Sequence, residues 1–360
     1  MMSRSAPVHP NGASAAMRLN NFDLIRLFAA LQVLIGHGST HLEAAVPGFV
    51  GAILAYFPGV PIFFIISGFL ISMSWDRAPS LKQYVWNRAL RIYPALWVCL
   101  FFSIGIFLAS GVKPDSLPSF FGWFFAQITL FQFYNPDFLR GFGIGVINGS
   151  LWTIPVELQF YILLPLLAIA AKRTRLIWVV HTLIAAALMI LAMPYLAERH
   201  TTIQKLFGVS IIPYLFLFLI GVLTRQLYEK YPNLFKGKGL IWSGVYGLWV
   251  AIEIIFDIDG GSGNRLNVVS IILLGMLTVS FAFSKSELSS YILKNNDISY
   301  GVYIYHVPVI NFLMFNQIIG LLGFVAMLFV TIVIAMLSWR FIEKPALGLK
   351  NYSLLQRGGV

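Results

Sequence analysis

Residues 120–133 read FFGWFFAQITLFQF, and whether this apolar run crosses a membrane decides the topology of the whole chain. The run has 14 residues, whereas an α-helix needs about 20 residues to cross the ~30 Å hydrocarbon core of a bilayer. Apolar runs of this length are more often interfacial or re-entrant. We therefore predict that residues 120–133 do not cross the bilayer.

The rest of the chain has the composition of a membrane protein. Of its 360 residues, 58% are hydrophobic and only 11% are charged, and the mean hydropathy is +0.80. A soluble domain typically has about 25% charged residues. Apolar runs of roughly the length that spans a bilayer predict ten transmembrane helices. They lie near residues 20–38, 49–74, 90–110, 150–171, 176–194, 208–224, 240–257, 266–284, 299–319 and 322–340.

The distribution of lysine and arginine supports ten spans. If residues 120–133 do not cross and the N-terminus is cytoplasmic, 20 of the 25 basic residues lie on the cytoplasmic side and five lie outside. If the run crosses, the split becomes 11 to 14. Because cytoplasmic loops carry the excess of basic residues, the expected fold class is an all-α polytopic membrane protein with about ten transmembrane helices and both termini cytoplasmic. The same bias explains the net charge of +11, so we expect no nucleic-acid partner.

The predicted domain organisation is a disordered cytoplasmic tail at 1–19, one membrane domain at 20–345 and a short cytoplasmic tail at 346–360. Residues 1–19 lack the apolar centre of a cleavable signal peptide, so the first span is expected to serve as an uncleaved signal. The single cysteine, Cys99, excludes a disulfide within the chain. We expect no metal site, because the histidines lack metal-ligand spacing and no HExxH motif occurs.

The first stretch with candidate chemistry is RLFAALQVLIGH at 26–37. On a helix, the 11 residues from Arg26 to His37 rotate by about 20° past three turns and rise by ~16 Å, so the two side chains share one face. Asp23 precedes Arg26 by three residues and is expected to pair with it. Taken singly, the arginine reads equally well as an interfacial anchor and the histidine as a polar helix end. Their shared face favours a common polar cavity, because ionisable groups inside membranes usually mark function.

The second stretch is NRALRIYP at 87–94. Arg88 and Arg91 lie three residues apart on one helical face, at the predicted cytoplasmic mouth of the third span. Two guanidiniums in this arrangement suit a phosphate or a carboxylate. The alternative is an ordinary basic flank of a membrane helix.

The third stretch is NGSLWTIPVELQFYILLPLL at 148–167. Glu157 is expected about 10 Å inside the outer surface, counting ~1.5 Å per residue along a helix. A carboxylate at that depth is expensive unless it is paired, so it indicates either a functional site or a structural hydrogen-bond partner. Trp152 suits the outer interface, and Pro155 and Pro165 are expected to bend or break the helix.

Two further stretches place polar residues within predicted spans. SYGVYIYHVPV at 299–309 surrounds His306 with tyrosines, and the histidine reads either as functional or as a packed residue bonded to a backbone carbonyl. GVPIFFIISGFLIS at 59–72 contains Ser67 and Gly68, which suit close helix approach.

These stretches, in this order, resemble the acyltransferase-3 family of integral membrane O-acyltransferases. The resemblance runs from about residue 20 to 345. The matching blocks are FDLIRLFAALQVLIGH at 22–37, FFIISGFLIS at 63–72, NRALRIYPAL at 87–96, SLWTIPVELQFYILLP at 150–165 and ISYGVYIYHVPV at 298–309.

The resemblance implies an enzyme of the bacterial cytoplasmic (inner) membrane that moves an acyl group, commonly acetyl, from cytoplasmic acyl-CoA to an acceptor. The expected acceptors are hydroxyls of a cell-surface or lipid-linked glycan such as O-antigen or exopolysaccharide. Some relatives instead modify small molecules such as macrolides. Acyl-CoA is then a co-substrate and no cofactor is bound permanently. We expect a stand-alone form without the C-terminal esterase-like domain of many relatives.

The family motifs fall on Arg26 and His37, on Arg88 and Arg91, and on Glu157. The arginines are expected to hold the acyl-CoA phosphates. His37 is expected either to act as a general base or to accept the acyl group transiently, and Glu157 to orient the histidine or the acceptor. The alternative functions are a secondary transporter or glycan flippase and, least favoured, a non-catalytic scaffold. The residues expected to support the site are Asp23, Ser67, Trp152, Tyr300 and His306.

Overall fold

The computed structural model describes residues 20–77, 80–172, 174–198, 201–258, 261, 263–285 and 287–350. This part of the chain is helical and contains no strand, which confirms the all-α class. The predicted tail at 1–19 and residues 351–360 lie outside the described part. The predicted domain boundary at 345 falls inside a short helix that ends at Gly348.

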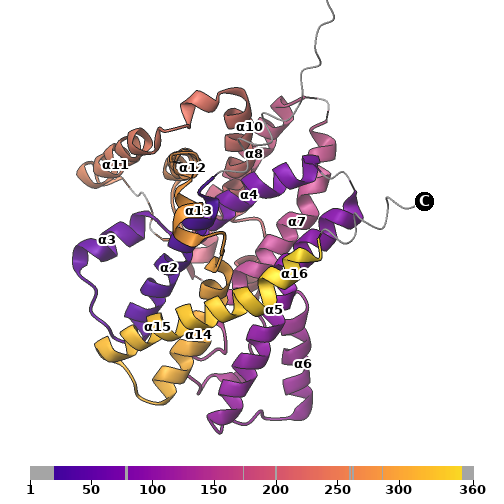
Figure 1. Ribbon diagram of the computed structural model, residues 1–360, viewed down its shortest axis with the longest axis vertical. Coiled ribbons are helices and arrows are strands. Elements are labelled where there is room, and N and C mark those ends of the chain that lie inside the picture. The colour runs from indigo at the N-terminus through magenta and orange to yellow at the C-terminus, as the bar shows by residue number, and fades with distance from the viewer. Residues whose placement is uncertain are drawn as a thin grey trace, which may run out of the picture.

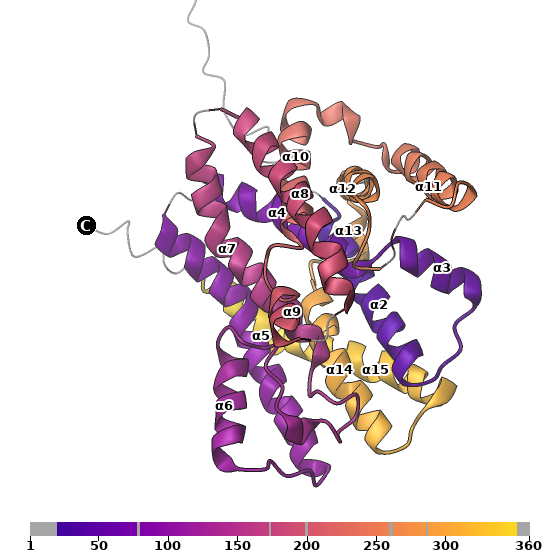
Figure 2. The ribbon, with the colours of Figure 1, turned by 180° about the vertical axis from the view of Figure 1, so that it is seen from behind.

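The helices form one bundle in which the N-terminal and C-terminal helices lie side by side (Figures 1 and 2). A short turn at Gly149–Trp152 leads into α7, and a π-helical turn at Trp339–Glu343 joins α15 to α16. The α-helices are α2 (Phe22–His41), α3 (Gly48–Tyr56), α4 (Gly59–Arg77), α5 (Leu81–Ala109), α6 (Leu117–Ile128), α7 (Thr153–Ala170), α8 (Leu176–Glu198), α9 (Thr202–Phe207), α10 (Leu215–Lys230), α11 (Gly239–Ile255), α12 (Val268–Ala282), α13 (Leu288–Leu293), α14 (Ser299–Phe315), α15 (Gly320–Ser338) and α16 (Lys344–Gly348).

Long apolar helices make this a membrane protein. The helical stretches of sufficient length and apolarity to cross a bilayer are Gly48–Arg77, Leu81–Ala109, Gly149–Ala170 and Gly320–Gly348. Shorter apolar helices occupy Leu176–Ala192, Gly239–Ile255 and Val268–Ala282. Large apolar side chains stay exposed on the outside of the bundle, as at Leu191, Leu240 and Leu321, which suits contact with lipid. The count of ten spans and the cytoplasmic position of the termini remain predictions.

The predicted span at 49–74 is broken into two helices, α3 and α4. Pro58 stands at the break, where its missing N–H cannot continue a helix. The side chain of Gln32 on α2 bridges the two helix ends. Its amide nitrogen donates to the Leu54 carbonyl at 2.9 Å, and its amide oxygen accepts from Gly59 N–H at 2.8 Å. The continuous apolar run at 49–74 therefore gave no indication of the break between α3 and α4, which the Gln32 side chain stabilises.

Glycines let α4 and α10 cross at close range in the centre of the bundle. A Cβ atom added to Gly68 would lie 1.9 Å from the Phe218 carbonyl oxygen, and one added to Gly221 would lie 2.0 Å from that of Ile65. Neither position therefore admits a larger side chain. The prediction that Gly68 permits close helix packing is confirmed.

Prolines inside α7 and α14 free backbone carbonyls that distant side chains then satisfy. Pro165 leaves the Tyr161 carbonyl without its helical donor, and the Tyr84 hydroxyl donates to that oxygen at 3.1 Å. Pro308 does the same to Ile304, whose carbonyl accepts from Asn148 at 2.7 Å. These bonds tie α5 and the residue before the Gly149–Trp152 turn to the proline-containing helices, as the cost of an unsatisfied carbonyl in lipid requires.

Residues 120–128 of the apolar run belong to α6, a helix of 12 residues that begins at Leu117 and lies along α5, and residues 129–133 follow the helix (Figures 1 and 2). The last carbonyls of α6 accept hydrogen bonds from α5 side chains. Trp97 Nε1 donates to the Ile128 oxygen at 3.1 Å, and the Tyr93 hydroxyl donates to the Thr129 oxygen at 3.2 Å. Because Tyr93 and Trp97 lie near the middle of the 29-residue α5, α6 ends about halfway along that helix, and the prediction that residues 120–133 do not cross the bilayer stays a prediction.

Candidate active site

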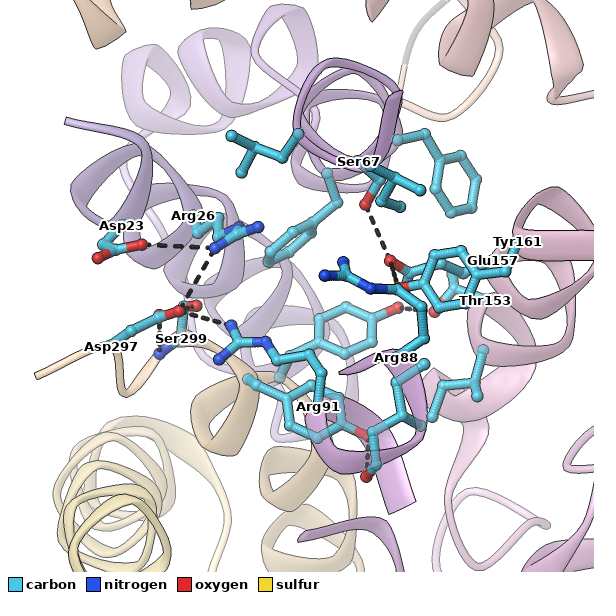
Figure 3. A pocket seen from close by; sticks show the side chains of 18 of the residues that line it. Asp23, Arg26, Ser67, Arg88, Arg91, Thr153, Glu157, Tyr161, Asp297 and Ser299 are labelled. Carbon is cyan, nitrogen blue, oxygen red and sulfur yellow. Dashed lines mark hydrogen bonds and ion pairs between the residues drawn. The ribbon is translucent and has the colours of Figure 1, made fainter. Parts of the chain in front are cut away.

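A cavity of about 340 Å³ lies between α2, α4, α5, α7 and α14 (Figure 3). It brings together side chains that the sequence places in all five candidate stretches. The predicted site residues that line it are Asp23, Arg26, Ser67, Arg88, Arg91, Glu157 and Tyr300.

One end of the cavity holds a cluster of ion pairs around the buried carboxylate of Asp297. Arg91 Nη2 lies 2.5 Å from Asp297 Oδ2, and Arg26 Nη1 lies 3.5 Å from the same oxygen and 3.4 Å from Asp23 Oδ1. The predicted pairing of Asp23 with Arg26 is therefore present. Burial raises the pKa of Asp297, but Arg91 and Arg26 outweigh burial and hold that pKa below its usual value. The Ser299 hydroxyl also donates to Asp297 at 2.5 Å, so the carboxylate is fully engaged.

Arg88 differs from the other two arginines because it forms no ion pair within the described residues. Its guanidinium carbon lies 5.8 Å from the centre of the Tyr161 ring, and its buried Nε has no hydrogen-bond partner there. Figure 3 shows the guanidinium pointing into the cavity between Arg26 and Glu157. A buried guanidinium with an unused donor suits an incoming anion.

Lys350 adds a fourth cation to the wall of the cavity. Burial, assisted by the charges of Arg88, Arg91 and Arg26, lowers the pKa of its ammonium group to about 7. Four cations and three carboxylates therefore line the described cavity, and an anionic ligand would relieve the excess positive charge.

Glu157, on α7, faces the cavity opposite the arginines (Figure 3). Its Oε1 atom accepts from the Ser67 hydroxyl at 2.9 Å and from the Tyr161 hydroxyl at 2.5 Å. The carboxylate thus links α4 to α7, and Ser67, expected to support helix packing, reaches the cavity as well. This arrangement fits both the functional and the structural interpretation of the glutamate.

His37 and His306 form a pair across two helices. Nδ1 of His37, on α2, lies 2.9 Å from Nε2 of His306, on α14. His306 is completely buried, and its Nδ1 lies 3.3 Å from the Val302 carbonyl oxygen. His41, one turn beyond His37, packs its ring at 5.9 Å from that of His37.

The cavity and the histidine pair are adjacent but are not one open space. Tyr303 lines the cavity, and its ring centre lies 6.0 Å from that of His306. Phe63, which also lines the cavity, packs against Tyr303 with ring centres 5.4 Å apart. The Tyr303 hydroxyl is held by Thr153 at 2.9 Å and by the Ser150 carbonyl at 3.0 Å. Because His37 is not a lining residue, the expected single cavity from Arg26 to His37 is interrupted at Tyr303.

A family model of an acyltransferase domain, Acyl_transf_3, matches residues 19–340. The chain belongs to the acyltransferase-3 family. It is therefore an enzyme that transfers acyl groups, and the resemblance of its five sequence blocks is confirmed. An acyltransferase accounts for the buried ionisable residues, so neither the transporter nor the scaffold hypothesis is needed to explain them.

Relatives of this acyltransferase support membrane O-acyl transfer. The chain is 30% identical to nodulation protein 10 of Rhizobium leguminosarum bv. viciae, over 97% of this chain and 98% of that protein. It is 27% identical to an O-acetyl transferase of Shigella phage Sf6, over 90% and 95% of the two chains. It is 24% identical to the O-acetyltransferase OatA of Staphylococcus aureus, over 94% of this chain but 59% of that protein. No solved structure matches the chain.

Three predicted residues of the acyltransferase, His37, Trp152 and His306, lie apart from the cavity wall, and two site residues were missed. Trp152 packs against Tyr214, with ring centres 5.2 Å apart, and His306 lies beyond Tyr303. The missed residues are Asp297 and Lys350. Asp297 directly precedes the 298–309 block, so an acidic residue at the arginine end was visible in the sequence. Lys350 follows the last predicted span, and in the sequence it was interpreted only as one of the basic residues on the cytoplasmic side.

Proposed function

We propose that this membrane acyltransferase moves an acyl group, acetyl in the simplest case, from acyl-CoA to a hydroxyl of a cell-surface or lipid-linked glycan. The observation that carries the proposal is the convergence of Arg26, Arg88, Arg91 and Lys350 on one end of a cavity whose far wall touches a histidine pair. Relatives named as O-acetyltransferases support acetyl as the group and a hydroxyl as its acceptor.

The cations would bind the phosphates of the donor. Charge-assisted hydrogen bonds from guanidiniums to phosphate are among the stronger polar contacts in proteins. Arg88 offers an unused donor, whereas Asp297 already orients Arg91 and Arg26. This end of the cavity would then face the cytoplasm, where acyl-CoA is found, in agreement with the predicted excess of basic residues on that side.

The acyl end of the donor would extend toward His37. About 16 Å separates Arg26 from His37 along α2 at ~1.5 Å per residue, which is comparable to the reach of a pantetheine arm. Tyr303 and Phe63 stand in this path, so the acyl carbon reaches the histidine only when these rings shift. The closed wall would keep water from the thioester until then.

Two routes remain open for the transfer step. In the first, His37 takes the proton of the acceptor hydroxyl, the oxygen bonds to the acyl carbon, and the thioester C–S bond breaks. The leaving CoA thiolate then receives that proton. In the second, His37 attacks the acyl carbon and releases the thiolate, the acceptor oxygen then displaces the histidine from that carbon, and the hydroxyl proton passes to the CoA thiolate. Both routes need one unprotonated nitrogen of His37.

The acceptor is proposed from the names of the relatives, and a small molecule such as a macrolide is the alternative. The test uses membrane vesicles from cells that make the protein and acetyl-CoA labelled in the acetyl group. We expect label in alkali-sensitive ester on glycan, and no such label with Arg88→Ala/Arg91→Ala protein present at the same level. Label that appears only in solvent-extractable small molecules would contradict the glycan proposal, and equal labelling by the variant would contradict the donor site.

A further inference from the structure

We infer that His306 is a positioning residue that fixes the tautomer of His37 and leaves Nε2 of His37 unprotonated for reaction. The inference rests on the proposed function, because it assigns His306 a role in the step that His37 would perform. His306 does not line the cavity, and in this role it touches neither donor nor acceptor and acts only through His37.

The hydrogen bonds of His306 determine where its proton lies. Its Nδ1 is 3.3 Å from the Val302 carbonyl oxygen, which can only accept, so Nδ1 carries the proton. In a neutral imidazole the other nitrogen is then an acceptor. Nε2 of His306 therefore offers a lone pair to His37.

The lone pair on Nε2 of His306 in turn determines which nitrogen of His37 carries its proton. Its Nδ1 lies 2.9 Å from Nε2 of His306, and the acceptor at that position requires Nδ1 of His37 to be the donor. Nε2 of neutral His37 is then left with a lone pair. This is the nitrogen that either route of acyl transfer requires, and it makes no hydrogen bond within the described residues.

The surroundings of His306 hold this arrangement in place. The side chain is completely buried on α14, and the freed Ile304 carbonyl on the same helix is bonded by Asn148 at 2.7 Å. On the next turn toward its start, α14 packs so closely on α15 that a Cβ added to Gly301 would lie 2.9 Å from the Ala335 backbone. A rigid, dry acceptor imposes one tautomer on its partner, because the wrong tautomer would bring two lone pairs or two N–H groups together.

The positioning role predicts different effects for two conservative substitutions of His306, by glutamine and by asparagine. The amide oxygen of glutamine can replace Nε2, so His306→Gln keeps an acceptor for His37. Asparagine is shorter, so His306→Asn replaces the Nδ1 contact with Val302 but leaves His37 without its acceptor. His306→Leu removes both contacts.

The test measures CoA release from acetyl-CoA in membrane vesicles that carry the native acceptor, together with acetyl-CoA affinity of the purified proteins. We expect His306→Asn and His306→Leu to slow release by about 100-fold, the lower range of general acid–base catalysis. We expect His306→Gln to recover to within about tenfold of the unsubstituted enzyme. Affinity for acetyl-CoA should stay within about twofold in all three, because the arginine cluster is untouched.

Two outcomes would overturn the inference. One is unimpaired release by His306→Asn, and the other is equal loss in the asparagine and glutamine variants. A parallel measurement on His37→Ala distinguishes failure of the positioning role of His306 from failure of the catalytic role of His37. If that variant is inactive while His306→Asn is fully active, only the positioning role fails, whereas an active His37→Ala removes the catalytic assignment itself.

A spectroscopic measurement covers the case in which the variants do not fold. The ¹⁵N signals of His37 in the unsubstituted protein distinguish an Nδ1-protonated ring from an Nε2-protonated one. The inference requires the Nδ1-protonated form. A ring protonated at Nε2 would overturn it without any substitution of His306.

Discussion

Arg91, on the third predicted span, is bonded to Asp297, which lies 206 residues further along the chain. The carboxylate approaches the arginine fork from the loop before α14, so a site expected to bind donor phosphates already contains a buried anion. Asp297 therefore does two things: it neutralises part of the arginine charge, and it fixes the directions of Arg91 and Arg26.

Removing that carboxylate should destabilise the protein. We expect Asp297→Asn to lower the free energy of unfolding by about 3 kcal/mol, because breaking one side of a buried pair leaves an uncompensated charge. The exposed pair of Asp137 with Arg140, 3.6 Å apart, supplies the matched control, since Asp137→Asn should have little effect. Thermal unfolding in detergent measures both. Equal stability of the two variants would show that the buried pair contributes nothing.

Arg88 should contribute to donor binding without a comparable role in stability. It forms no ion pair within the described residues and points into the cavity. Arg88→Ala should weaken acetyl-CoA binding by about tenfold to 100-fold, the range of a hydrogen bond to a charged group. Calorimetric titration measures this, with Lys82→Ala as a control on an exposed site of the same helix. Similar losses in both variants would indicate a general effect of positive charge.

Donor affinity should fall as the pH rises above about 7. Burial, assisted by the neighbouring arginines, lowers the pKa of Lys350 to about 7. Below that pH the ammonium is already charged, so binding an anion needs no proton. Above it, binding must draw a proton onto Lys350, and the affinity declines until the pKa of the bound form is reached.

Titrations of acetyl-CoA between pH 7 and 9, in buffers of different ionisation enthalpy, measure both the decline and the proton uptake. Lys350→Arg should bind with little pH dependence in this range, because a guanidinium stays charged. A flat profile for the unsubstituted protein would mean that Lys350 does not meet the donor.

The aromatic wall between the cavity and the histidine pair should limit acyl length. Phe63→Ala removes the ring that packs against Tyr303 and opens space where the acyl group would lie. We expect butyryl-CoA use to rise relative to acetyl-CoA by about tenfold, since one or two methylenes in a pocket discriminate by such factors. Phe63→Leu, which keeps most of the volume, is the control. An unchanged ratio of CoA release from the two donors would place the acyl group elsewhere.

The sequence was sufficient wherever the decisive contact was local. The spacing of Arg26 and His37 put both on one continuous helix, and Asp23 pairs with Arg26. The five sequence blocks identified the family. Each of these follows from helical periodicity, apolar length or residue order, which a single chain displays directly.

The remaining features depend on how distant helices pack. His37 meets His306 across 269 residues, and Gln32 bridges the break between α3 and α4. Tyr303 closes the cavity only because α14 lies beside α2 and α4 in the bundle. No local pattern specifies which face of one membrane helix touches another, since lipid-facing and protein-facing positions are both apolar.

Separating donor binding from transfer in one variant tests the central claim most directly. His37→Ala protein should bind acetyl-CoA within about twofold of the unsubstituted enzyme, because the cations that would hold the donor line the cavity and His37 does not. It should nevertheless release no CoA from acetyl-CoA in acceptor-bearing membrane vesicles. Release at the unsubstituted rate would contradict the account, and so would loss of acetyl-CoA binding together with release.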